Sequence, residues 1–213
     1  MSPRVMYGLV GLVGLCLGIA AVLTTNTGGP TDPNPMLKDS TALFGQERPL
    51  PAFTLTDHNG ETYDTERLKG RWTLVFFGYT HCPDVCPTTL STLALAAKTL
   101  RETLDGQSLQ MTFVSIDPKR DTQERLAQYV PYFDSEFLGV TGAAAELDKL
   151  VSALGAIYVL GTPDSTTGIY TVDHSSRLLL VDPQARFTAI LSDRAAPKVL
   201  AADLKTILEA YST

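Results

Sequence analysis

The chain has 213 residues, of which 44% are hydrophobic, and it carries a formal net charge of −6 at neutral pH. This length is typical of one domain with an appendage. A nucleic-acid-binding protein needs a basic face, so the acidic balance excludes nucleic acid as a predicted partner.

The first 23 residues predict a membrane anchor. Residues 5–23 carry no charge and are mostly apolar, and as a helix they would rise about 28 Å, close to the thickness of the hydrocarbon core. They lack a clear small-x-small cleavage site, which favours an uncleaved anchor over a signal peptide. Arg4 precedes this segment and the next basic residue is Lys38. That bias predicts a single-pass topology with the rest of the chain outside.

Residues 24–48 predict a flexible linker, because they are rich in Thr, Gly, Pro and Asn and show no hydrophobic period. Residues 49–213 then predict one α/β domain. Within it, the continuous apolar run over 72–77 is typical of a central strand covered on both faces. The apolar residues after Cys86 recur every three or four positions, which predicts a helix with one buried stripe.

The remaining elements follow from the same patterns. Asp121 is interpreted as the cap of a helix, and Asp117-Pro118 as a turn. An opening hairpin, a β-α-β-α series with thiols after the central strand, an antiparallel strand pair and a last helix together predict a thioredoxin-like fold. The expected elements are a hairpin over 53–63 closed by Asn59-Gly60, strands over 72–77 and 109–116, helices over 86–104, 121–129 and 143–154, a short strand over 156–160, strands over 177–181 and 186–191, and a helix over 197–211.

Cys82 and Cys86 are the residues that point most directly to a function. They stand where the central strand gives way to a helix, and a helix N-terminus favours the thiolate form that both redox exchange and soft-metal binding require. Their spacing places the two Cα atoms about 6 Å apart on a helical turn, close enough for a disulfide or for one shared ion. A purely structural disulfide and two unrelated buried cysteines remain simpler alternatives.

The search for a third ligand is short, because the chain has three histidines. His58 is expected to be solvated in the hairpin turn, and His81 adjoins Cys82, so its side chain should point away from that thiol. His174 directly precedes the strand over 177–181, and in a thioredoxin-like arrangement that entry loop lies against the thiol turn. His174 is therefore the best candidate.

Two thiolates and one imidazole suit Cu(I). Structural zinc would need a fourth ligand, which only His81 or Asp84 could supply. Asp173 is a candidate to orient the imidazole of His174, while His81 and Asp84 are candidates to surround the metal. Thioredoxin-like oxidoreductases use Cys-x-x-Cys, and this chain has one residue more between its cysteines.

Three segments resemble the Sco/SenC family: FFGYTHCPDVCP over 76–87, SIDPKRDT over 115–122 and VDHS over 172–175. The resemblance implies a membrane-anchored copper protein that helps to assemble the CuA centre of cytochrome c oxidase. It implies that Cys82, Cys86 and His174 hold copper, as Cu(I) and also Cu(II). Copper binding requires reduced thiols, so oxidation of the two cysteines to a disulfide would release the ion.

The implied partners are cytochrome c oxidase subunit II, an upstream copper donor and, through the N-terminal helix, the membrane. The implied location is the bacterial inner membrane with the domain in the periplasm, or the mitochondrial inner membrane facing the intermembrane space. The chain is then a metallochaperone and not an enzyme. The alternative is a thiol–disulfide oxidoreductase that reduces the CuA cysteines of the same partner. A peroxidase is less favoured, since no arginine stands near Cys82 or Cys86 in the sequence.

Overall fold

The computed structural model describes residues 31–104 and 109–211, and the predicted membrane anchor lies outside them. Within these two ranges, no helix is both long and apolar enough to cross a bilayer. The elements in chain order are η1 (Asn34–Met36), β1 (Ser40–Ala42), β2 (Arg48–Pro49), β3 (Thr54–Asp57), β4 (Thr62–Asp64), α2 (Thr65–Leu68), β5 (Trp72–Gly78), α3 (Val85–Thr103), β6 (Leu109–Ser115), α4 (Gln123–Tyr129), β7 (Leu138–Thr141), α5 (Ala144–Ala153), β8 (Tyr158–Leu160), β9 (Val172–His174), β10 (Leu178–Val181), β11 (Arg186–Leu191) and α6 (Pro197–Tyr211).

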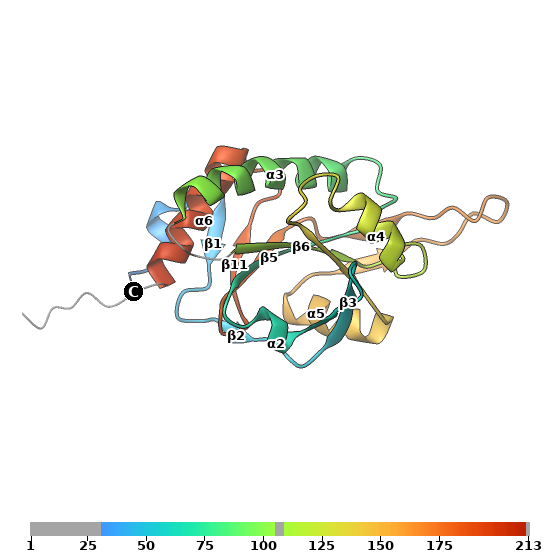
Figure 1. The fold of residues 1–213 in the computed structure, drawn as a ribbon, viewed down its shortest axis with the longest axis horizontal. Helices are drawn as coiled ribbons and strands as arrows, with labels where there is room; N and C mark the ends of the chain where they lie inside the picture. The colour runs from blue at the N-terminus through green and yellow to red at the C-terminus, as the bar shows by residue number, and fades with distance from the viewer. Residues whose placement is uncertain (1–30, 105–108, 212–213) are drawn as a thin grey trace, which may run out of the picture.

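A mixed sheet runs through the middle of the molecule, with helices on both faces (Figure 1). Its strand order is β1-β11-β10-β5-β6-β7-β3-β4, and β2 pairs with β11. The central strand β5 runs parallel to β6 and antiparallel to β10. All seven residues of β5 are buried, as expected of an apolar strand covered on both sides. The predicted thioredoxin-like α/β architecture is confirmed.

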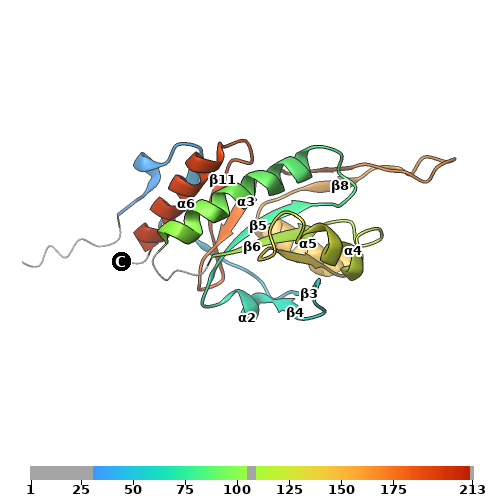
Figure 2. The ribbon, with the colours of Figure 1, turned by 45° about the horizontal axis from the view of Figure 1, so that its top comes forward.

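The alternation of side chains along the central strands divides the core in two. Leu74 and Phe76 of β5 pack in a cluster with residues of α3 and α6, and these two helices lie side by side on that face (Figure 2). Val75 and Phe77 pack on the opposite face with the buried side of α5. Because β5 and β6 are parallel, their carboxyl ends lie at the same edge of the sheet. The polar residues that follow each strand, such as Thr80 and Asp117, therefore lie at this edge.

The opening hairpin also forms as predicted. Strands β3 and β4 pair antiparallel with Leu55 opposite Tyr63. The turn between them uses Gly60 with φ +86°, a left-handed conformation that a residue with a side chain rarely adopts. His58 is only partly exposed there, because its Nδ1 accepts a hydrogen bond from the Gly139 backbone N–H at 2.9 Å. The expectation of a solvated His58 is therefore wrong.

Two further expectations need correction. The predicted linker over 24–48 contains η1 and β1, and β1 pairs with β11 through Ser40, Thr41 and Ala42. The small and polar residues of this segment have no local hydrophobic pattern, and they form a strand because they pair with β11. The folded domain therefore begins before residue 49. Strands β7 and β9 were not expected. Each has only three or four residues; β7 pairs with β3 and β6, which are distant in sequence, and β9 pairs with β8, the strand directly before it in the chain.

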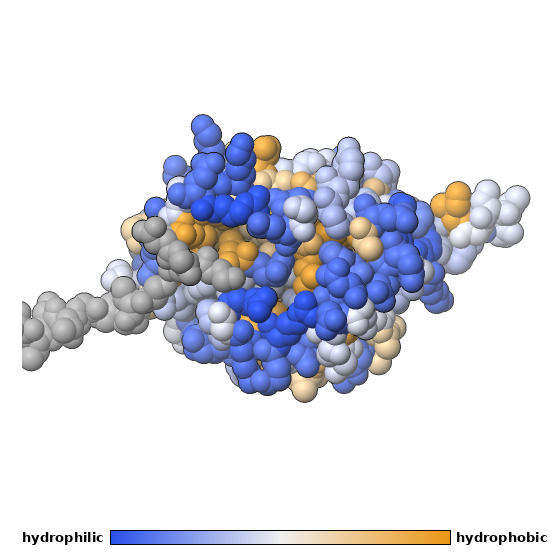
Figure 3. All heavy atoms as spheres, in the orientation of Figure 1, coloured by the Kyte–Doolittle hydropathy of each residue, from blue (hydrophilic) through white to orange (hydrophobic). Residues whose placement is uncertain are grey.

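Strands β8 and β9 form a separate two-stranded sheet. The chain between them projects well beyond the body of the molecule (Figure 2). We call residues 157–175 the arm. Its exposed apolar side chains are Ile157, Val159, Leu160 and Ile169, and apolar surface is visible on the projection (Figure 3).

Candidate metal centre

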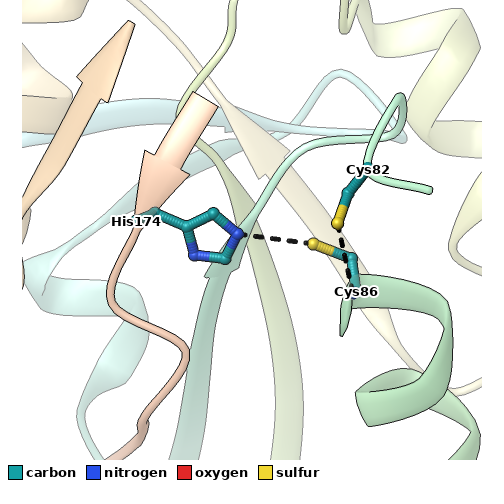
Figure 4. A group of neighbouring side chains, drawn as sticks. All are labelled: Cys82, Cys86 and His174. Atoms are coloured by element: carbon teal, nitrogen blue, oxygen red, sulfur yellow. Dashed lines mark hydrogen bonds between the residues drawn. The ribbon is translucent and has the colours of Figure 1, made fainter. Parts of the chain in front are cut away.

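Cys82 lies in the connection from β5 to α3, Cys86 is the second residue of α3, and His174 ends β9 at the base of the arm. The strand β5 ends at Gly78, and the chain then turns so that the Cys82 N–H donates to the Tyr79 carbonyl at 3.2 Å. The Cys86 N–H in the first turn of α3 donates to Cys82 Sγ at 3.4 Å. Both sulfur atoms lie on the side of the turn that faces the imidazole of His174 (Figure 4).

The three side chains converge as the sequence predicts. One ligand atom from each of Cys82, Cys86 and His174 lies within 4.8 Å of the other two, and Cys86 Sγ is 3.6 Å from His174 Nε2. His174 Nδ1 is 3.0 Å from the Ser175 carbonyl oxygen. A carbonyl only accepts, so Nδ1 carries the proton and Nε2 presents its lone pair to the sulfurs. These donors fit a soft metal ion without any change of tautomer.

The two thiols differ in their surroundings. Cys86 is fully buried, whereas Cys82 is partly exposed. Burial raises the pKa of the Cys86 thiol, and the nearby Cys82 sulfur and Asp121 carboxylate act in the same direction. The lowered thiol pKa expected at the helix N-terminus is therefore not found at Cys86, where loss of hydration raises the pKa. A bound metal ion would have to displace that proton.

Glycine is required at position 78, the last residue of β5 before the chain turns toward Cys82 and Cys86. A Cβ at this position would lie 2.8 Å from Cys86 Sγ and 2.6 Å from the Phe113 ring. Real Cβ contacts are longer, so any larger residue would move the sulfur or the ring. The absence of a side chain lets Cys86 pack directly on the sheet.

Two aromatic rings flank the imidazole of His174. The ring centroids of Phe76 and Tyr79 are 6.3 and 6.0 Å from that of His174, both in edge-on arrangements. Such contacts restrict the rotation of the imidazole. Neither ring was identified from the sequence, although both belong to the strand and turn that lead to Cys82.

The other predicted site residues lie apart from the three donors. His81 is half exposed and its Nδ1 lies 3.5 Å from Asp121 Oδ1. Asp84 is an exposed residue directly before α3, and Asp173 is exposed on β9. His174 Nδ1 meets the Ser175 carbonyl, so a backbone group occupies the position expected for the Asp173 carboxylate.

Sequence reasoning missed the role of Asp121. Thr122, and not Asp121, caps α4. Asp121 is fully buried and accepts hydrogen bonds from Thr80 N and Oγ1, each at 2.7 Å, and from Ser115 Oγ at 2.6 Å. The sequence did hold a signal for this role. Thr80 and Ser115 stand at the ends of two strands predicted to be neighbours, and the carboxyl ends of parallel strands meet at one edge of a sheet, as the pairing of Gly78 with Ser115 shows.

Comparison with known proteins identifies the family. The SCO1/SenC family model matches residues 43–209, which is most of the chain. The chain belongs to the SCO1/SenC family. The resemblance predicted from three sequence segments is thus confirmed.

Relatives of this SCO1/SenC protein include proteins solved with copper. A Stutzerimonas stutzeri protein is 42% identical over 154 residues, covering 71% of this chain and 74% of the relative. The human mitochondrial SCO1 homologue is 34% identical and matches 75% of this chain, which spans 52% of that longer protein. Bradyrhizobium japonicum ScoI with copper bound is 36% identical, covers 74% of this chain and 98% of the solved chain, and superposes with a TM-score of 0.66.

The difference between the two thiols of the SCO1/SenC protein predicts their order of alkylation. At neutral pH we expect iodoacetamide to modify Cys82 first, because Cys86 is fully buried and its pKa is raised. A raised thiol pKa means that Cys86 modification should increase as the pH is taken into the alkaline range. Peptide mapping by mass spectrometry measures each site separately, and unfolded protein serves as the control. Equal rates at the two cysteines in the folded protein would contradict this assignment.

Proposed function

We propose that this protein is a metallochaperone that binds copper through Cys82, Cys86 and His174 and delivers it to the CuA centre of cytochrome c oxidase subunit II. The convergence of two sulfurs and one imidazole nitrogen within 4.8 Å carries the proposal. These are the donors that Cu(I) prefers. Membership of the SCO1/SenC family and the copper-bound relatives support the same metal.

Three donors also suit transfer. A three-coordinate ion leaves a position at which a thiolate of the receiving site can attack, so that copper passes through a shared intermediate and is never free. The partly exposed Cys82 is the donor that a partner reaches first, whereas Cys86 lies beneath it. Binding Cu(I) displaces the proton of the buried Cys86 thiol, and reprotonation of Cys86, whose pKa burial raises, favours release.

Redox chemistry of the two cysteines belongs to the same proposal. Oxidation of Cys82 and Cys86 to a disulfide removes two of the three donors, so copper is held only while the thiols are reduced. We place the domain outside the membrane, in the bacterial periplasm or the mitochondrial intermembrane space, anchored by the N-terminal segment and loaded by an upstream copper donor. Cys82 and Cys86 could instead reduce the CuA cysteines of subunit II, which is the second candidate function.

A transfer experiment separates the two functions. The Cu(I)-loaded protein is mixed with reduced, copper-free CuA domain of the host's subunit II, the two are separated, and copper is measured in each. We expect copper to move to the CuA domain, and His174→Ala to deliver none. If copper stays where it was, while the reduced copper-free protein converts a CuA disulfide into two thiols and becomes oxidised itself, the reductase function replaces the metallochaperone.

A further inference from the structure

The loop between β6 and α4, residues 116–122, contacts both parts of the chain that supply the metal donors. Through Asp121 it binds Thr80, two residues before Cys82. Through Asp117 and Arg120 it binds Tyr170 on the arm, four residues before His174. One loop therefore fixes the cysteine side and the histidine side of the centre relative to each other.

The contacts to the arm form a closed set, which we call the arm clamp: Asp117, Arg120 and Tyr170. The Tyr170 hydroxyl donates to Asp117 Oδ1 at 2.7 Å, and Arg120 Nη1 donates to the Tyr170 carbonyl at 2.8 Å. Arg120 Nε donates to Asp117 Oδ2, completing the set. Asp117 is fully buried, so its charge depends on this arginine.

Stacking extends the clamp to the metal centre. The Arg120 guanidinium lies 3.6 Å from the centroid of the Tyr170 ring and 5.5 Å from that of Tyr79. Tyr79 in turn contacts the imidazole of His174 edge-on, with centroids 6.0 Å apart. The guanidinium thus packs between the arm and the ring beside His174.

Outside the clamp, the contacts that hold the arm lie at its base. Among the described residues, strands β8 and β9 pair only with each other, and the apolar side chains of the arm, Ile157, Val159, Leu160 and Ile169, are exposed. On the β8 side, the Tyr158 hydroxyl donates to Asp148 of α5 at 2.7 Å. On the β9 side, Val172 is buried against the core and its backbone is hydrogen-bonded to Tyr79, while Tyr158 and Tyr170 pack partly against the same cluster. A segment with so little buried surface opens at low free-energy cost unless specific contacts hold it.

We propose that Asp117, Arg120 and Tyr170 are positioning residues that hold His174 on the bound copper. This inference rests on the proposed function, since it concerns the third donor of that site. Without the clamp, the arm samples more conformations. Binding copper must then also order His174, and the conformational entropy lost in this step weakens the affinity for copper. Groups that orient a metal-bound imidazole contribute about 10- to 100-fold to metal affinity, and the clamp acts in that way through the backbone.

Two mild variants test the clamp without stranding the buried Asp117 charge. Tyr170→Phe keeps the ring that stacks on Arg120 but loses the hydroxyl, and Arg120→Lys keeps the positive charge but loses the planar fork. Lys119→Met, at an exposed neighbouring position, is the matched control. Each is made in the full chain, alone and combined with His174→Ala, and Cu(I) affinity is measured by competition with a chelator.

We expect each clamp variant to bind Cu(I) about tenfold more weakly than the parent, and to have no further effect once His174 is alanine. In the metal-free protein we expect faster amide hydrogen exchange over 172–175 and unchanged exchange in β5. An unaltered affinity, or an equal loss with and without His174, would overturn the proposal. If His174→Ala alone binds copper like the parent, the proposed site has failed, and the exchange measurement still decides whether the clamp holds the arm.

Discussion

Replacing His174 by alanine is expected to cost the protein its tight copper binding while leaving the fold intact. His174 supplies the only nitrogen donor among the three converging atoms, so the variant leaves two sulfurs. The loss should exceed the about 10- to 100-fold that follows when only an orienting partner of a ligand is removed. The fold should persist, because His174 is partly exposed and ends a short strand.

The measurement is a Cu(I) competition titration, joined with X-ray absorption on the loaded protein. The parent is expected to show two sulfur scatterers and one nitrogen or oxygen scatterer, and the variant is expected to lose the light scatterer. His81→Ala is the matched control, because His81 adjoins Cys82 but interacts with Thr80 and Asp121. Equal affinity in His174→Ala and the parent would refute the assignment of the third donor.

Asp121→Ala is expected to destabilise the fold by about 3–5 kcal/mol, because it leaves three buried donors without their charged acceptor. Those donors are Thr80 N, Thr80 Oγ1 and Ser115 Oγ. Their loss detaches the turn before Cys82 from the end of β6, so copper binding should weaken as well. A substitution of this kind acts on the candidate centre and on the fold together.

Urea unfolding of the reduced, metal-free protein measures this effect. Asp173→Ala, at an exposed aspartate, is the control and should change the free energy of unfolding by less than about 0.5 kcal/mol. Ser115→Ala removes the Ser115 hydroxyl, which is one of the three donors. We expect this variant to lower the free energy of unfolding by about 1 kcal/mol, between the other two variants. If Asp121→Ala were as stable as Asp173→Ala, the hydrogen bonds of Asp121 with Thr80 and Ser115 would not contribute to the stability of the fold.

Local patterns carried most of the fold prediction. The apolar run of β5, the three-and-four spacing along α3 and the Asn59-Gly60 turn each specify one element without reference to the rest of the chain. Short strands that form only through pairing with another segment were not predicted. The strand β1 is ordered by β11, β7 by β6 and β3, and β9 by β8. None of these short segments has a period long enough to be recognised alone.

The sequence by itself determined the chemistry of the candidate centre: two cysteines four positions apart at the start of a helix, and a histidine before a late strand. Residue type and spacing are local properties, so they could be read directly. Only the tertiary structure decided the surroundings of those donors. Burial reversed the expected direction of the Cys86 pKa, a backbone carbonyl and not Asp173 oriented the imidazole, and Asp117 and Asp121 proved to be buried acceptors. Each of these depends on which distant segments meet at the edge of the sheet, because desolvation and hydrogen-bond partners are set by packing and not by neighbours in sequence.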